Sequence, residues 1–305
     1  MNKTIRIGTR DSELALWQAH TVEKKLKDFG YKTEIVAVKS QGDIILDKPL
    51  YELGITGIFT KTLDIAMING QVDIAVHSMK DVPTALPIGI VQAAVLERAN
   101  TLDILVHKGN LDFLNGEGTI ATGSLRRQAQ WLNKYPNHKV VNLRGNVNTR
   151  MQKLQESDWN GAVFAAAGLE RINLKPSNYI DLDWMIPAPA QGAMVVVAMA
   201  NDEFCREAIS ELNDIETEVC THIERQFLKT LEGGCTAPIG ALAVFLEDEI
   251  VFKGVLFSID GKQKIEIEKT VPLQEWKKLG FTAAQEVLVN GGVELMTKIK
   301  NNLKK

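Results

Sequence analysis

One cysteine stands on a loop that should present its side chain outward. Residues 231–235 read Leu-Glu-Gly-Gly-Cys, and Thr-Ala-Pro follows. Glycine has no Cβ and lets the backbone approach a ligand closely, and Pro238 limits the conformations that follow. Most lone cysteines are nevertheless buried and act as small hydrophobic residues. Cys235 is therefore a candidate reactive residue whose role depends on the rest of the chain.

Arginine is concentrated in one part of a chain that otherwise uses lysine. There are 25 lysines and 10 arginines, and five of the arginines fall between residues 126 and 171, beside only three lysines. They are Arg126, Arg127, Arg144, Arg150 and Arg171. A planar guanidinium binds carboxylate or phosphate through two hydrogen bonds, and lysine does not reproduce this. Each arginine alone could be a solvated surface charge, but the cluster predicts an anion site.

A third group of polar residues follows an apolar strand expected at 72–76. Lys80 and Asp81 come directly after it and before Pro83. They could be a neutral surface pair. However, a strand at 4–8, a helix to about Gly30 and a strand at 34–38 predict a β-α-β unit, whose ligand site lies at the strand C-termini. Arg10 and Ser12 lie in the first such loop, where we also expect Ser12 to cap the helix.

The arginine-rich region has the same organisation. Strands are expected at 103–106, 119–122, 139–143 and 162–167, and the last three are each followed by arginine. Because parallel strands end at one edge of a sheet, these arginines should share that edge with helix N-termini, which favour anions. The pattern predicts a cleft that binds a polycarboxylate or a phosphate compound.

The elements predict an α/β protein with a third, α+β part. A strand at 193–198 should return the chain to the first sheet, as in a hinged two-domain cleft. Strands at 241–245, 249–256 and 264–270, with a turn at Asp260-Gly261, predict a meander, and two helices follow, near 273–278 and from about 282. We expect residues 1–97 with 193–213 in the first domain, 98–192 in the second and 214–305 in the third.

Composition excludes several classes of partner. The 305 residues are 45% hydrophobic and 24% charged, with a formal net charge of −3, which disfavours nucleic acid. The N-terminus lacks the apolar region of a signal peptide, and no apolar run reaches the roughly 18 residues of a membrane span. Three scattered cysteines fit a reducing cytosol, and five scattered histidines give no metal motif. We therefore expect a cytoplasmic protein without membrane, nucleic-acid or metal partners.

Four segments together resemble the porphobilinogen deaminase family, also called hydroxymethylbilane synthases. They are Val-His-Ser-Met-Lys-Asp-Val-Pro at 76–83, Ser-Leu-Arg-Arg at 124–127, Leu-Arg-Gly-Asn-Val at 143–147 with Arg150, and Leu-Glu-Gly-Gly-Cys at 231–235. The resemblance covers essentially the whole chain.

That resemblance implies an enzyme that joins four porphobilinogen molecules head to tail, releases ammonia at each step and makes the linear tetrapyrrole hydroxymethylbilane. It implies a dipyrromethane cofactor held by a thioether to Cys235, two domains like hinged periplasmic binding proteins, and a monomer. Asp81 matches the catalytic aspartate of the family. A carboxylate near the pyrrole N–H groups would stabilise the positive charge that develops and assist proton transfer.

Each pyrrole carries an acetate and a propionate, so a growing chain presents many carboxylates. The residues expected to bind cofactor and substrate carboxylates are Arg10, Ser12, Lys80, Thr122, Ser124, Arg126, Arg127, Arg144, Arg150 and Arg171. Other residues expected in the cleft are Gly145, Asn146 and Gln191.

Two segments depart from the family pattern. Residues 122–124 read Thr-Gly-Ser where many relatives have Thr-Ser-Ser, so Gly123 removes one hydroxyl. Residues 54–57 read Gly-Ile-Thr-Gly in place of a common Gly-Gly-Lys-Gly, and we leave this loop out of the expected site.

Two other functions compete with the deaminase. A non-catalytic α/β module that binds an acidic small molecule would show the same arginines, but it gives no reason for Cys235 on its glycine loop. A cysteine-dependent acyltransferase would need a histidine partner, and no histidine lies in a suitable motif. The intact mass of the denatured protein separates these possibilities, because only the deaminase would carry an adduct of two deaminated substrate units.

Overall fold

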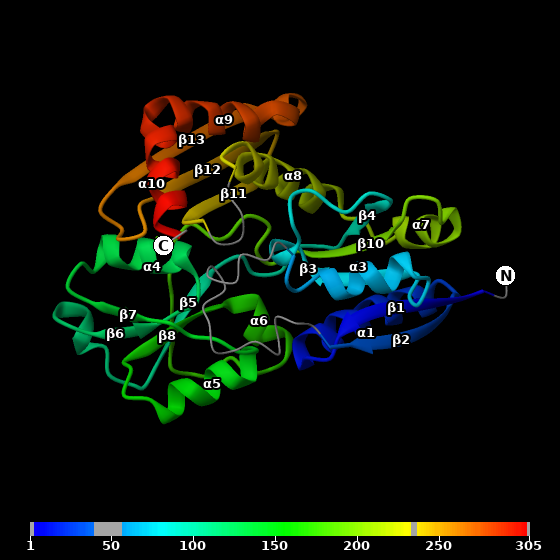
Figure 1. Ribbon diagram of the computed structural model, residues 1–305, viewed down its shortest axis with the longest axis horizontal. Helices are drawn as coiled ribbons and strands as arrows, with labels where there is room; N and C mark the ends of the chain where they lie inside the picture. Colours follow the sequence, from blue (N-terminus) through cyan, green and yellow to red (C-terminus); the bar gives the residue numbers. More distant parts are fainter. Residues whose placement is uncertain (1–2, 40–56, 233–236, 304–305) are drawn as a thin grey trace. The chain divides into compact units, whose positions relative to one another are not determined.

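The computed structural model describes residues 3–39, 57–232 and 237–303, and three β-sheets form its framework (Figure 1). These residues divide into two compact units. The first comprises residues 3–39, 57–99 and 192–218, and the second comprises residues 100–191, 219–232 and 237–303. The three-domain boundaries expected from the sequence stay a prediction.

The first unit is built on a five-stranded sheet in the order β2-β1-β3-β10-β4. Its strands are β1 (Thr4–Arg10), β2 (Lys32–Val38), β3 (Ile74–Ser78), β4 (Ile90–Val95) and β10 (Met194–Met199). Strand β1 pairs in parallel with both β2 and β3, whereas β10 runs antiparallel between β3 and β4. The predicted β-α-β opening and the returning strand are therefore confirmed.

Helix α1 (Glu13–Asp28) connects β1 to β2 and buries one face against this sheet. Apolar residues three or four positions apart meet on one side of a helix. The buried ones are Ala15, Ala19, Val22 and Leu26. Helices α3 (Lys61–Ile68) and α7 (Glu203–Ser210) complete the unit.

The second unit contains a five-stranded sheet in the order β7-β6-β8-β5-β9. Its strands are β5 (Asp103–His107), β6 (Thr119–Ala121), β7 (Lys139–Val141), β8 (Gly161–Ala165) and β9 (Tyr179–Asp181). Strand β6 pairs in parallel with both β7 and β8, so these three adjacent strands all end at one edge. This is the arrangement expected for the arginine-bearing strands.

A short helix follows each of the three parallel strands. These helices are α4 (Leu125–Lys134), α5 (Val147–Glu156) and α6 (Ala166–Arg171). A helix that begins directly after a parallel strand brings its unpaired N–H groups to the strand-end edge. The local sequence thus places arginine side chains and helix N-termini at the same edge.

The same unit contains an antiparallel meander of β11 (Ile239–Leu246), β12 (Glu249–Phe257) and β13 (Lys264–Pro272). The predicted turn between the last two strands is confirmed, with Gly261 at φ +73°. A side chain disfavours this left-handed backbone, which explains the glycine.

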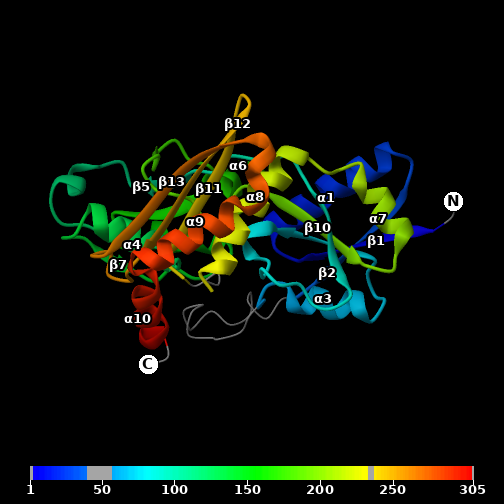
Figure 2. The ribbon, with the colours of Figure 1, turned by 90° about the horizontal axis from the view of Figure 1, so that it is seen from above.

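Helices pack on this meander around one apolar core, and α9 lies along β12 and β13 (Figure 2). They are α8 (Ile215–Thr230), α9 (Leu279–Val287) and α10 (Val293–Leu303). The segment Leu273–Lys278 is a 3-10 helix, and the single helix expected from about residue 282 is split where Gly291 adopts φ +96°. In the core, the rings of Phe227 and Phe252 meet edge to face, 5.2 Å between centroids.

Candidate functional site

The strand-end edge of the first unit collects the residues expected there. Strand β1 ends at Arg10, and β3 ends at Ser78 before a 3-10 turn over Met79–Asp81. Because β1 and β3 are parallel neighbours, Arg10, Ser12, Lys80 and Asp81 belong to the same edge.

Asp81 differs from Asp73, which also lies at one end of β3, in having no partner among the described residues. It is half-buried, and its carboxylate makes no hydrogen bond or ion pair with any residue that the structure describes. By contrast, Asp73 accepts hydrogen bonds from the Arg6 backbone and guanidinium at 2.8–3.0 Å. The Asp81 carboxylate is therefore available to a ligand.

Arg10 and Ser12 were predicted, together with Asp81, to belong to the site at this edge. The Arg10 guanidinium lies over the ring of Phe59, 4.8 Å from its centroid, a cation–π contact that orients the charged group. Ser12 occupies the N-cap position of α1, but its hydroxyl makes no capping hydrogen bond. The predicted position of the helix cap at Ser12 is confirmed, although it is the Ser12 carbonyl and not the hydroxyl that accepts from the helix, at 2.9 Å from the Leu16 nitrogen.

His77 was missed as a site residue because burial is not visible in a sequence. It lies in β3, four residues before Asp81, and its Nε2 atom is buried without a hydrogen-bond partner among the described residues. Burial, with a smaller effect from the Arg10 charge, lowers the pKa of His77 to about 3. The imidazole is therefore neutral at physiological pH.

In the second unit, the loop before α4 is fixed by its own hydroxyl groups. The Ser124 nitrogen donates to Thr122 Oγ1 at 3.2 Å, and the Arg127 nitrogen donates to Ser124 Oγ at 3.5 Å as a weak helix cap. Gly123 stands between them, where a Cβ would lie 2.6 Å from the Leu143 carbonyl oxygen. The departure from the family pattern at position 123 therefore has a steric reason in this chain.

Arg126 and Arg127 are buried and share one carboxylate, that of Asp103 in β5. Arg126 Nη1 lies 2.7 Å from Asp103 Oδ2, and Arg127 Nη2 lies 2.7 Å from Oδ1. Arg127 also donates from Nε to Asp103 at 2.9 Å and from Nη1 to the Val163 carbonyl at 3.0 Å. Two guanidinium groups against one carboxylate leave this group with an excess positive charge, which an anionic ligand would offset.

One N–H donor of Arg126 makes no hydrogen bond within the described part of the chain. Its Nη1 donates to the Ile186 carbonyl at 2.8 Å, but its buried Nε has no hydrogen-bond partner in the described part of the chain. Burial lowers the pKa of Arg126, Asp103 raises it, and the Arg127 charge lowers it further. A buried, incompletely satisfied guanidinium fits a carboxylate ligand, as expected for a pyrrole acetate or propionate.

Asp103 was missed by sequence reasoning, which treated it only as part of a strand. It also accepts from Gln191 Nε2 at 3.0 Å, and the same nitrogen donates to the Thr101 carbonyl at 2.8 Å. Gln191, one of the predicted cleft residues, is thus joined to the two arginines through Asp103. A charged residue at the start of an otherwise apolar strand was the available signal.

The loop between β7 and α5 brings four more predicted residues together. Gly145 adopts φ +117°, and Asn146 caps α5 by accepting from the Thr149 nitrogen at 2.9 Å. Arg150 Nε reaches back to the Gly145 carbonyl at 2.7 Å, while Arg144 is buried just before this turn. The motif therefore builds a rigid loop at the strand-end edge.

Arg171 ends α6, after the third parallel strand. Burial lowers its pKa to about 10, with Glu170 acting in the opposite direction, so the guanidinium stays charged at neutral pH. Its position agrees with the expectation that each of the three strand ends is followed by arginine.

The predicted attachment loop lies outside the described residues. This applies to Cys235, Gly233 and Gly234, and also to residues 54–56 of the other departing loop. The other two cysteines, Cys205 and Cys220, are buried. Burial and Asp202 raise the pKa of the Cys205 thiol to about 12, which makes it a poor nucleophile.

Residues 3–39, 57–232 and 237–303 contain neither a membrane-spanning helix nor a cluster of metal-binding side chains. No helix there has both the length and the apolar character needed to cross a bilayer. No cluster of three or more His, Cys, Asp or Glu side chains in those ranges could hold a metal ion.

The fold and these residues define a class: an α/β protein with buried arginines after its parallel strands and one half-buried carboxylate that no described residue pairs. Residues 5–207 match the family model described as "Porphobilinogen deaminase, dipyromethane cofactor binding domain", and residues 218–289 match "Porphobilinogen deaminase, C-terminal domain". The porphobilinogen deaminase of Desulfitobacterium hafniense is 42% identical over 308 residues, with 99% of each chain covered. The chloroplastic porphobilinogen deaminase of Oryza sativa subsp. japonica is 43% identical, covering 94% of this chain and 84% of that protein.

The chain belongs to the porphobilinogen deaminase family. It is a transferase that condenses four porphobilinogen molecules head to tail, with release of ammonia, into hydroxymethylbilane, and its cofactor is dipyrromethane. Among solved structures, a periplasmic substrate-binding protein of an ABC transporter from Coxiella burnetii has a TM-score of 0.43 and 15% identity, over 70% of this chain and 94% of that one. A likeness at that level carries no argument, and the fold class follows from the sheets themselves.

Proposed function

We propose that Asp81 is the catalytic carboxylate of the deaminase reaction. The observation that carries this assignment is the half-buried carboxylate at the end of β3, which no described residue pairs or hydrogen-bonds. A partly desolvated carboxylate interacts more strongly with a nearby positive charge than one in bulk water. Asp81 would stabilise the charge that develops on a pyrrole ring during condensation and would accept and return protons at its Oδ atoms.

The carboxylates of cofactor and substrate are proposed to bind the cationic residues of the two strand-end edges. In the second unit, the excess positive charge of the Arg126, Arg127 and Asp103 group supports this, as does the spare Nε donor of Arg126. The further donors proposed are Arg10, Ser12, Lys80, Thr122, Ser124, Arg144, Arg150 and Arg171. Gly145, Asn146 and Gln191 would shape the loops at the strand-end edge of the second unit.

The dipyrromethane is proposed to be attached through a thioether to Cys235. When bound, it supplies the pyrrole carbon to which the first new unit is joined. The burial of Cys205 and Cys220 supports this choice among the three cysteines, because neither presents its sulfur to solvent. The donor set also fits the group, since a dipyrromethane carries four carboxylates and Arg126 and Arg127 share the single carboxylate of Asp103.

A cytoplasmic monomer is the expected state of the protein. Reduced, buried Cys205 and Cys220 agree with a reducing compartment.

Intact mass of the denatured protein tests the attachment. We expect the wild-type chain and Cys205→Ser, a matched control, to carry an adduct equal to two deaminated substrate units. Cys235→Ser should have the unmodified mass and no turnover. A fully active wild-type protein without any adduct would exclude the covalent cofactor. A wild-type protein with neither adduct nor turnover would favour the alternative, a non-catalytic module for an acidic ligand.

A further inference from the structure

One face of helix α4 carries both Arg126, the arginine proposed to bind substrate, and the buried side-chain amide of Gln130. Arg126 and Gln130 are four residues apart, so both side chains leave the helix on the same side. Gln130 is only 3% exposed. A buried carboxamide must find hydrogen-bond partners, because leaving its groups unpaired costs free energy.

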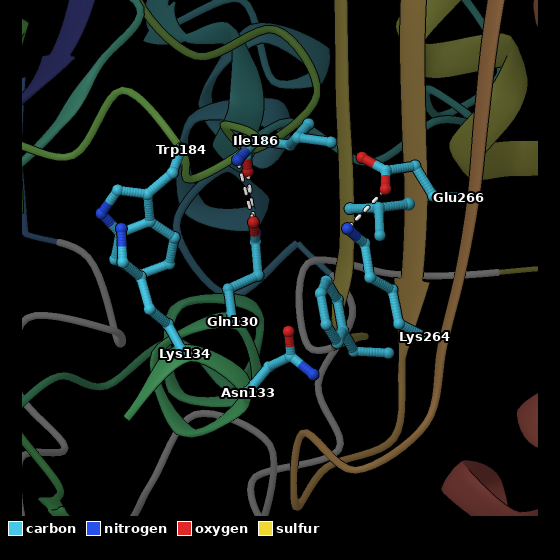
Figure 3. A pocket seen from close by; sticks show the side chains of 9 residues that line it. Gln130, Asn133, Lys134, Trp184, Ile186, Lys264 and Glu266 are labelled. Carbon is cyan, nitrogen blue, oxygen red and sulfur yellow. Dashed lines mark hydrogen bonds and ion pairs between the residues drawn. The ribbon is translucent and has the colours of Figure 1, made fainter. Parts of the chain in front are cut away.

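Gln130 hydrogen-bonds the backbone of a single residue, Ile186, and Arg126 contacts the same residue. The Ile186 nitrogen donates to Gln130 Oε1 at 2.8 Å, and Gln130 Nε2 donates to the Ile186 oxygen at 2.9 Å (Figure 3). The same Ile186 oxygen accepts from Arg126 Nη1 at 2.8 Å. The Gln130 side chain thus hydrogen-bonds both backbone polar atoms of Ile186, and the Ile186 carbonyl in turn accepts a hydrogen bond from Arg126.

Ile186 lies between β9 and β10, outside the strand ladders of the described chain. Its side chain packs against Ala129, Val255 and Phe257, and the next carbonyl, that of Pro187, accepts from the Ala241 nitrogen of β11 at 3.0 Å. A hollow of about 230 Å³ opens beside Ile186, lined among others by Gln130 and Trp184 (Figure 3). The hydrogen bonds of Gln130 act together with this packing to fix the direction of the Ile186 carbonyl.

We propose that Gln130 is a positioning residue for Arg126: by holding the Ile186 peptide, it aims the guanidinium at the substrate carboxylate. This inference rests on the proposed role of Arg126 in binding that carboxylate. Gln130 itself touches no substrate. Its loss should therefore weaken substrate and cofactor binding and leave the chemical step intact.

The test uses the full-length, cofactor-loaded enzyme and the variant Gln130→Met, which keeps the side-chain length but neither donates nor accepts. We expect the KM for porphobilinogen to rise about tenfold and kcat to stay within about twofold of the wild-type value. The lost contact binds the substrate in the ground state and in the transition state alike, so its loss raises KM and leaves kcat nearly unchanged. Lys134→Gln, which alters the same hollow without contacting Ile186, is the control and should keep the wild-type KM. The double variant Gln130→Met with Arg126→Met should be no worse than Arg126→Met alone, because both act through one contact.

A second readout does not depend on turnover. Apoprotein of each variant is incubated with porphobilinogen, and the denatured mass gives the fraction that carries the adduct with time. Gln130→Met and Arg126→Met should both load more slowly than Lys134→Gln. If Gln130→Met does not fold, Gln130→Glu replaces it. A carboxylate there should draw Arg126 away from Ile186 and also raise KM.

The outcomes are distinguishable. A wild-type KM and loading rate in Arg126→Met would overturn the proposed role of Arg126, and the positioning inference with it. A raised KM in Arg126→Met beside a wild-type KM in the folded Gln130 variant would overturn the positioning inference alone. Equal losses in Gln130→Met and Lys134→Gln would also overturn it, since a general disturbance of the hollow would then explain both.

Discussion

The two strand-end edges differ in whether their charged side chains have hydrogen-bond and ion-pair partners. In the first unit, Asp81 is half-buried and has no partner among the described residues. In the second unit, Arg126 and Arg127 are buried and held by Asp103 and by backbone carbonyls. A carboxylate that takes part in proton transfer must stay available, whereas cations that recognise carboxylates work best when fixed in advance. The contrast predicts that substitution of Asp81 changes the rate, whereas substitution of Asp103 changes stability.

The largest effect is expected at Asp81. Asp81→Ala should reduce kcat by about 10³-fold or more, because it removes both the charge and the proton acceptor. Its melting temperature should match the wild type, since the side chain loses no contact with a hydrogen-bond or ion-pair partner among residues 3–39, 57–232 and 237–303. Steady-state rates of cofactor-loaded enzyme and thermal denaturation measure the two quantities. Wild-type turnover in Asp81→Ala would remove the assignment.

At Asp103 we expect substitution to lower the stability of the protein. Asp103→Ala leaves two buried guanidinium groups without their carboxylate and should lower the free energy of unfolding by about 3–5 kcal/mol. Urea denaturation measures this. The control is Asp183→Ala, at an exposed position in the same unit, with an expected change within about 0.5 kcal/mol. Equal stability of the two variants would show that the arginines do not depend on Asp103.

A smaller loss of stability is expected when a side chain is added at Gly123, in the strand-end loop of the second unit. Gly123→Ser should destabilise the protein by about 1–3 kcal/mol, because the new Cβ would lie 2.6 Å from the Leu143 oxygen. Gly123→Ala carries the same Cβ without the hydroxyl and should cost as much. If serine proved neutral, as its presence in many relatives would suggest, the close approach of Leu143 would not restrict this position.

The smallest effect concerns His77, the buried neutral group of the first edge. Its pKa is about 3 in the folded chain against an ordinary value of 6.5, so below pH 6.5 only the unfolded chain takes up the proton. The stability contribution is complete above pH 6.5 and falls by about 1.4 kcal/mol for each pH unit below it, until the folded value is reached.

Urea midpoints at pH 7 and about pH 5.5 measure this dependence. His77→Leu should lose about 1.4 kcal/mol less than the wild type over that interval. His20→Gln, at an exposed position, should keep the wild-type difference. An unchanged pH dependence in His77→Leu would mean that the imidazole is protonated in the folded chain.

Much of the fold followed from local patterns. Apolar spacing located α1 and the β-α-β opening, and the Asp260-Gly261 turn located the last hairpin. These predictions succeeded because periodicity and turn chemistry act between residues close in the chain. The split between α9 and α10 was not predicted, because a single glycine inside a helical pattern does not reveal its φ.

The candidate site was predictable in type but not in pairing. Arginine after three successive strands indicated an anion site, and the parallel order β7-β6-β8 brings those strand ends to one edge. The sequence did not reveal that Arg126 and Arg127 share Asp103, which precedes them by more than twenty residues. Pairing across a sheet depends on strand order, which local patterns do not encode.

By itself, the sequence determined the α/β class, the order of the elements and the chemical types at the strand ends, since these depend on near neighbours in the chain. Its motifs also identified the family. Only the tertiary structure decided which of these groups are buried and partnered: Asp81 without a described partner, Arg126 and Arg127 held by Asp103, Ser12 at a cap position that its hydroxyl does not use, and His77 neutral inside the sheet. Desolvation and long-range contacts set these properties, and both arise only when segments distant in the chain are packed together.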